Sequence, residues 1–200
     1  MEFKIYFEGG GDSTAGKASL RQGMRHFLGE LFDAARERSI RCNLVACGSR
    51  NDTFDRFKHE AAASPETFCV LLVDSEDAVK TGPISHLTRR DSWSFADTDE
   101  NSIHLMVRTM ETWIVADQQS LADYYGHHFN AKALPVTDDL ETVDKRTIRG
   151  GLKRATRKTQ KGSYEKIRHA SDLLARIDPA TVRRRCRHCD RLFVTLSAKM

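Results

Sequence analysis

Apolar and polar residues in the first half of the chain follow a repeating pattern. Short apolar runs at 3–7, 40–47 and 69–73 have the length and composition of strands. Between them, residues 17–38 carry apolar side chains at three- and four-residue steps, and 52–63 is a second helical stretch. This alternation predicts a parallel sheet with helices on both faces, joined by right-handed crossovers.

The pattern continues past an acidic loop, with a fourth strand predicted at 103–108 and a helix at 110–125. Beyond Pro135 it changes to charged stretches of helical character. These stretches lie at 140–159, 164–177 and 180–196. We therefore expect an α/β, Rossmann-like domain over 1–139 and a basic helical extension over 140–200 that packs on the same domain.

Charge divides the chain at the same place. Residues 1–139 hold 15 Lys and Arg against 22 Asp and Glu, a net charge of −7, whereas 140–200 hold 17 against 6, a net charge of +11. The densest basic run is Arg183, Arg184 and Arg185. Such a run either contacts a nucleic-acid backbone or solvates an exposed helix face, and both interpretations stay open. Under the first interpretation, these three arginines contact nucleic acid.

Composition narrows the class of protein. The chain has 200 residues, of which 40% are hydrophobic and 30% charged, so it contains enough apolar material for a folded core. Its apolar runs are far shorter than the roughly 20 residues that span a bilayer. The first residues lack the pattern of a secretory signal, and the five cysteines suggest reduced thiols. We expect a cytoplasmic protein without a membrane segment.

One motif suggests a nucleotide-binding loop. The segment from Gly11 to Lys17 has the spacing G-x-x-x-x-G-K and lies between a predicted strand and a predicted helix. Ala18, however, stands where a P-loop needs a hydroxyl for Mg²⁺. Glu8, just before the glycines, would repel a bound phosphate. A P-loop nucleotide-binding protein is therefore the less favoured alternative.

Carboxylates at the strand ends suggest a different site. Glu8 ends the first predicted strand, and Asp74, Glu76 and Asp77 follow the third. In a parallel sheet these ends meet at the carboxyl edge, where ligand sites form. Asp74 shares a face with Glu76 if the chain stays extended, or pairs with Asp77 if a turn begins at Ser75. Clustered carboxylates repel one another unless a divalent cation such as Mg²⁺ or Mn²⁺ binds them.

These strand ends resemble a known signature. Phe-Glu-Gly at 7–9 and Leu-Val-Asp-Ser-Glu-Asp at 72–77 are similar to the Toprim domain of topoisomerases, primases and OLD-type nucleases. That family has a Glu after its first strand and Asp-x-Asp after its third. The resemblance implies a Toprim-like fold and a metal-dependent site at the sheet edge.

The resemblance also assigns the ligands. Glu8 corresponds to the Toprim glutamate, Asp74 to the first aspartate and Glu76 to the second. The chain departs from the family at Glu76, where Asp is expected, and Asp77 is the alternative ligand. Glu111, directly after the fourth predicted strand, is a further candidate ligand.

A wider spacing extends the resemblance over nearly the whole chain. It involves Met106, the Met-Glu-x-Trp motif at 110–113, the Tyr-x-Lys motif at 164–166 and the Arg-Leu-Phe motif at 191–193. Together they are similar to small Toprim-like proteins encoded beside ATPase genes in bacterial defence islands. The resemblance implies an ATPase partner and a role in antiviral defence.

One cysteine motif suggests zinc. Cys186, His188 and Cys189 have the spacing of half a zinc site. A closed tetrahedral site needs four ligands, and no second pair with suitable spacing exists, because Cys42 and Cys47 fall on opposite faces of a strand. The sequence therefore disfavours zinc.

The sequence and the resemblance together predict a Toprim-like nuclease that uses Mg²⁺ or Mn²⁺ to cleave phosphodiester bonds in DNA or RNA. Glu8, Asp74 and Glu76 are the expected catalytic carboxylates. Lys17 or Lys166 would stabilise the charge that develops on the phosphate, and Lys166 would also contact nucleic acid. The alternative is a non-catalytic regulatory or toxin-like subunit of an ATPase complex.

Overall fold

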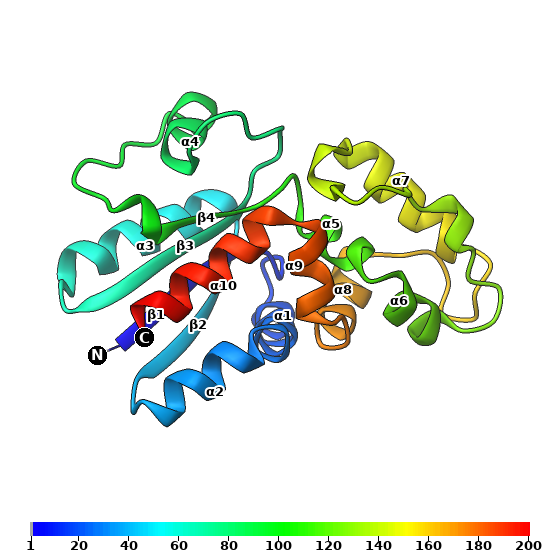
Figure 1. Ribbon diagram of the computed structural model, residues 1–200, viewed down its shortest axis with the longest axis horizontal. Helices are drawn as coiled ribbons and strands as arrows, with labels where there is room; N and C mark the ends of the chain where they lie inside the picture. The colour runs from blue at the N-terminus through cyan, green and yellow to red at the C-terminus, as the bar shows by residue number, and fades with distance from the viewer. Residues whose placement is uncertain (1) are drawn as a thin grey trace.

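Four parallel strands form the centre of the molecule in a computed structural model that describes residues 2–200 (Figure 1). The strands are β1 (Glu2–Glu8), β2 (Arg41–Gly48), β3 (Thr67–Asp74) and β4 (Ile103–Met106). Their order across the sheet is β2-β1-β3-β4, so β1 and β3 are the central strands. The predicted α/β fold with an all-parallel sheet is confirmed.

Helices cover both faces of this sheet and the region beyond its carboxyl edge (Figure 1). They are α1 (Thr14–Phe27), α2 (Gly29–Glu37), α3 (Arg50–Ala63), α4 (Pro83–Asp91), α5 (Met110–Ala116), α6 (Gln118–Tyr125), α7 (Lys145–Thr156), α8 (Lys166–Leu174), α9 (Pro179–Arg185) and α10 (Arg187–Lys199). Single 3₁₀ turns lie at Glu100–Ser102, Ala131–Ala133 and Leu140–Thr142. Among the described residues, no helix combines the length and the apolar character that crossing a bilayer requires.

Alternating strand residues build two apolar cores. Ile5 and Leu72 point to the face where Trp113 and the helices α1, α2 and α10 pack. Leu71 points to the opposite face and packs with Phe54 of α3 and with α4. The central strands are therefore buried on both sides, which explains why they are nearly continuous apolar runs in the sequence.

The long helices predicted at 17–38, 110–125 and 180–196 are each divided in two. The breaks fall at Leu28, Asp117 and Cys186. At Asp117 the carboxylate accepts a hydrogen bond from the amide of Ser120 at 3.1 Å and so caps α6. A cap of this kind interrupts the helix but leaves the apolar spacing in place, so the spacing alone does not reveal the break.

Two smaller differences concern helix bounds. The stretch predicted at 140–159 becomes α-helical only after Asp144, whose carboxylate accepts from the amide of Arg146 at 2.8 Å. Helix α4 was not predicted. It begins at Pro83 and buries only a short face that includes Leu87, too little for a periodic signal.

The basic extension shares a core with the sheet. Leu152 of α7 and Leu173 of α8 belong to the same apolar cluster as Ile5 of β1. Helix α8 lies directly on α1, where a Cβ atom on Gly23 would stand 2.4 Å from the carbonyl oxygen of Ser171. Only glycine permits this approach of the two helices.

Because α8 belongs to the main core, Leu173→Ala should lower the free energy of unfolding of the entire chain by about 2–5 kcal/mol. The matched control is Ile167→Ala in the same helix, whose side chain is 78% exposed; we expect a change within about 0.5 kcal/mol. Urea unfolding followed by circular dichroism measures both. A separate early transition in Leu173→Ala would show instead that the extension folds independently.

Candidate metal centre

Three carboxylates meet at the carboxyl edge of the sheet. One oxygen from each of Glu8, Asp74 and Glu76 lies within 4.8 Å of the others. Glu8 and Asp74 are the last residues of the adjacent strands β1 and β3, so strand pairing alone brings them together. This carboxylate cluster could hold a metal ion.

The backbone after β3 decides which acidic residue joins the cluster. Glu76 has a φ of +66°, in the left-handed region, and its amide donates to the carbonyl of Arg108 at 2.8 Å. The turn directs Glu76 back to the sheet edge. Asp77 points away, is 72% exposed and forms an ion pair with Arg90 at 3.4 Å. The structure therefore brings Glu76 into the cluster and leaves Asp77 outside it.

Asp74 is buried and held on both oxygens. Its Oδ1 accepts from the amide of Met110 at 2.8 Å, and its Oδ2 accepts from the hydroxyl of Thr109 at 3.1 Å. These donors fix the orientation of the carboxylate before any ligand arrives.

Glu111 lies beside the cluster rather than in it. It is buried, shares the single proton of the Thr109 hydroxyl with Asp74, and lies 3.5 Å from the guanidinium of Arg149. Burial opposes its ionisation, but the charges of Lys166 and Arg149 outweigh burial and hold the pKa of Glu111 below its ordinary value. Glu111 is thus an ionised neighbour of Asp74, linked to it through Thr109.

Four basic side chains surround these acids. They are Arg50, which follows β2, Lys145 and Arg149 on α7, and Lys166 at the start of α8. Only Lys166 was predicted from the sequence. The position of Arg50 just after a strand was a usable signal, whereas nothing local marks Lys145 or Arg149.

Each basic group has a defined partner. Arg50 lies 3.1 Å from Glu8, and Lys166 lies 3.5 Å from Asp74. Lys145 pairs with Glu76. Arg50 is held in turn by Asp91 at 2.7 Å and stacks on Trp93, whose ring centroid lies 5.0 Å away. Its guanidinium is therefore a fixed part of the site.

The carboxylates differ in how readily they ionise. Burial and the charge of Asp74 raise the pKa of Glu8 to about 7, against the opposing effects of Arg50 and Lys166. Burial also raises the pKa of Asp74, which Lys166 partly offsets. The hydrogen bond from Lys145 overcomes burial and lowers the pKa of Glu76. The basic groups therefore do not fully compensate the negative charge at Glu8 and Asp74.

The donor set fits a hard divalent cation. All three converging ligand atoms are carboxylate oxygens, which such ions prefer. A bound cation would also favour the ionised form of Glu8, whose pKa is raised first by burial and then by the charge of Asp74. Geometry and electrostatics thus favour the same class of ligand.

Comparison with known proteins adds a family. Residues 7–197 match the family described as "Domain of unknown function (DUF4276)". The chain belongs to this family. The match includes the whole carboxylate cluster and the basic groups around it, so the DUF4276 domain spans both the sheet and the extension. No curated protein and no solved structure matches the chain significantly.

Among the residues that the structure describes, Lys17 of the DUF4276 domain forms no ion pair with the carboxylates. It is inside α1, with its side chain against Gly48. Helix α1 begins at Thr14, and the amide of Gly16 donates to Ser13 Oγ at 3.0 Å. In a P-loop that amide would face a phosphate. Here it caps a helix, so the segment does not have the P-loop arrangement.

The arginine run at 183–185 is mainly engaged within the protein. Arg183 pairs with Asp190 at 2.8 Å. Arg185 donates to the carbonyls of Ala116 and Thr137 at 2.7 and 2.6 Å and so ties α9 to α5. Arg184 contacts Thr181 of its own helix at the surface. The structure assigns Arg183 and Arg185 a packing role in the extension.

The cysteine motif does not gather ligands in the described part of the chain. Cys186 and Cys189 are fully buried in the apolar core. His188 Nδ1 lies 2.6 Å from a carboxylate oxygen of Glu141. These side chains serve packing and local pairing.

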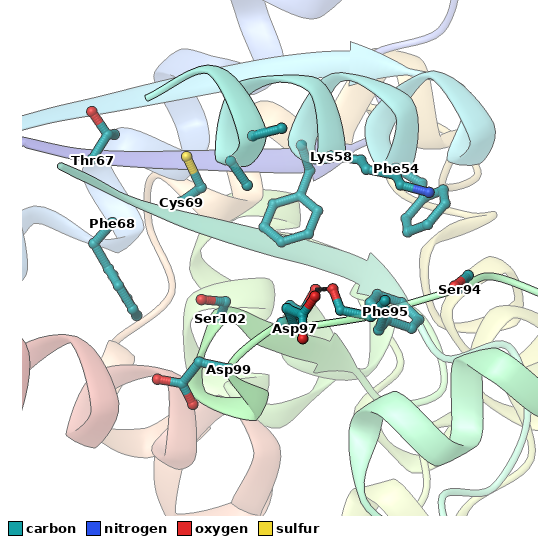
Figure 2. Close-up of a pocket in the computed structure, with 15 residues that line it drawn as sticks. Phe54, Lys58, Thr67, Phe68, Cys69, Ser94, Phe95, Asp97, Asp99 and Ser102 are labelled. Carbon is teal, nitrogen blue, oxygen red and sulfur yellow. Dashed lines mark hydrogen bonds between the residues drawn. The ribbon is translucent and has the colours of Figure 1, made fainter. Parts of the chain in front are cut away.

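A separate cavity of about 390 Å³ lies at the opposite end of β3. Figure 2 shows it between helix α3, which contributes Phe54 and Lys58, and the loop that carries Phe95. Its strand wall is Thr67 and Cys69, at the start of β3, whereas Asp74 ends that strand. This cavity is therefore not part of the carboxylate cluster.

The raised pKa of Glu8 predicts a pH-dependent stability. The folded chain holds this proton more tightly than the unfolded chain, whose ordinary value is 4.5. The metal-free protein should therefore lose stability as pH rises from about 4.5 to about 7, by up to about 3 kcal/mol. Glu8→Gln should lack this loss and be more stable than the wild type above about pH 7.

Urea unfolding in a chelating buffer, across a series of pH values, measures the difference between the two proteins. Parallel profiles, with a difference that does not change with pH, would contradict the assignment.

Proposed function

We propose that this protein is a nuclease that hydrolyses phosphodiester bonds with a divalent cation, Mg²⁺ or Mn²⁺, held by Glu8, Asp74 and Glu76. The observation that carries the proposal is the convergence of three carboxylate oxygens at the sheet edge, with basic side chains beside them. Carboxylates that can bind a metal ion and basic side chains that can bind a phosphate thus lie next to each other.

When bound, the cation supplies Lewis-acid polarisation of a phosphoryl oxygen and acidifies a water molecule. The chain's own residues do the rest. Thr109 and the amide of Met110 orient Asp74, and Arg50 orients Glu8. These contacts fix the two carboxylates in place before a metal ion binds, so less conformational entropy is lost on binding.

Lys166 is the residue best placed to bind the phosphate. Its ammonium lies 3.5 Å from Asp74 and has a raised pKa, because the charges of Asp74 and Glu111 outweigh burial. It therefore stays charged at neutral pH. From this position Lys166 would contact a phosphate of the substrate and stabilise the charge that develops there.

The resemblance of the strand ends to the Toprim signature supports the same reaction. The resemblance to small Toprim-like proteins encoded beside ATPase genes also leads us to propose an ATPase partner and a role in antiviral defence. Nucleic acid, DNA or RNA, is the proposed substrate.

Asp74→Asn and Glu8→Gln should each reduce Mg²⁺-dependent cleavage at least about 100-fold, because each removes an anionic oxygen from the cation. Both should also weaken Mn²⁺ binding measured by calorimetry. The control is Asp77→Asn, which removes an acid from the same turn but outside the cluster; it should cleave like the wild type. Single-stranded and duplex DNA and RNA are the substrates to test.

Two results would change the conclusion. Wild-type rates in both cluster variants would exclude the carboxylate mechanism. Mn²⁺ binding that depends on Asp74, without cleavage of any substrate by the wild type, would favour the non-catalytic subunit.

A further inference from the structure

A cavity of about 350 Å³ opens between the glycine-rich loop after β1 and the start of α8. It shares Glu8 and Lys166 with the metal centre. Among the described residues that line it, these two alone are charged, and the others are glycines, serines and aliphatic side chains. A ligand in this cavity therefore contacts the metal centre at one end and uncharged surface elsewhere.

The glycine loop gives the cavity a wall of bare backbone. Gly9, Gly10 and Gly11 have φ values of +123°, +88° and +63°. Gly10 also packs so closely on α1 that a Cβ atom would lie 2.7 Å from the Cα of Lys17. The loop therefore presents peptide planes rather than side chains, a surface that a flat ring can approach closely.

Ile167 forms the opposite side of the opening. Its side chain is 78% exposed, although it is large and aliphatic. A Cβ atom on Gly11 would stand 3.7 Å from Ile167 Cδ1, so Ile167 reaches the edge of the glycine loop and borders the cavity there. Ile167 directly follows Lys166. An exposed apolar side chain next to a phosphate-binding ammonium suits a ligand with a flat apolar part attached to a phosphate.

A second cavity of about 450 Å³ lies on the other side of Lys166 and Ile167. Its lining is densely charged, with Arg149, Lys153 and Lys166 on the basic side and Glu111 and Glu165 on the acidic side, so basic groups outnumber acidic ones, whereas the first cavity is mostly apolar. The hydroxyl of Tyr164 in its wall is buried and has no hydrogen-bond partner among the described residues. Such a surface suits the next phosphate of a chain that continues past the metal centre.

We infer that the first cavity receives one unpaired nucleoside of the substrate, while the second holds the neighbouring phosphate. This inference rests on the proposed nuclease function and narrows it to single-stranded nucleic acid. A base inside a duplex is stacked and paired, so it cannot enter the cavity without being extruded. A free nucleotide has the same chemistry as one unit of the strand, so the experiment separates these two sources.

The test measures binding by fluorescence anisotropy in a chelating buffer, where cleavage does not interfere. The probes are a labelled single-stranded oligonucleotide, the same strand in a duplex, and unlabelled adenosine monophosphate as competitor. Ile167→Ala removes the apolar side of the opening, and Ser19→Leu fills the cavity. The matched controls are Val136→Ala, exposed elsewhere, and Ala18→Leu, the neighbour of Ser19 outside the cavity.

We expect the wild type to bind the single strand more tightly than the duplex. Ile167→Ala and Ser19→Leu should each weaken single-strand binding about fivefold or more, and Ile167→Leu should restore it. Both control variants should bind like the wild type. The variants replace exposed side chains, so unchanged melting temperatures should accompany these effects.

Equal affinity for single strand and duplex, or unaltered binding by Ile167→Ala and Ser19→Leu, would overturn the inference. Binding of adenosine monophosphate without binding of either oligonucleotide would overturn it too, in favour of a free nucleotide. If cleavage requires Asp74 but is unaffected by Ile167→Ala, the proposed nuclease function is supported and the role of the cavity is excluded. If single-strand binding requires Ile167 but the wild type cleaves nothing, the role of the cavity is supported and the nuclease function is excluded.

Discussion

Compensation of buried carboxylates is the constraint on which the rest of this structure depends. An unpaired charge at a strand end would be costly to bury, and Asp74 is 1% exposed. The compensating groups come from distant parts of the sequence: Arg50 follows β2, and Lys166 begins α8. The acidic residues of 1–139 and basic residues of the extension therefore belong to a single ion-pair network.

The sequence predicts the sheet well because the sheet is buried on both faces. Strands such as β3 must then be apolar throughout, and such runs are easy to recognise between helical stretches. Helix ends are harder to predict. The break at Asp117 depends on a hydrogen bond to the amide of Ser120, which competes with helix continuation without altering the apolar spacing.

The same distinction applies to the carboxylate cluster. Glu8 and Asp74 were accessible from sequence because the ends of adjacent parallel strands must lie together. The choice between Glu76 and Asp77 was not, because it depends on a single left-handed backbone conformation at Glu76. The density of arginines at 183–185 indicated a local positive charge but not which groups these side chains contact. Arg185 in fact binds backbone carbonyls inside the protein.

The close contact between α1 and α8 lets the packing of the apolar core determine where the helix that carries Lys166 lies. Gly23 admits the backbone of Ser171 to a distance that a methyl group would forbid, and Lys166 starts the same helix. The position of the Lys166 backbone thus depends on a steric contact between two helices that lies outside the carboxylate cluster. An alanine at Gly23 would displace α8 and move Lys166 with it. We therefore expect substitutions at Gly23 to be as poorly tolerated as substitutions in the carboxylate cluster itself, although Gly23 lies outside it.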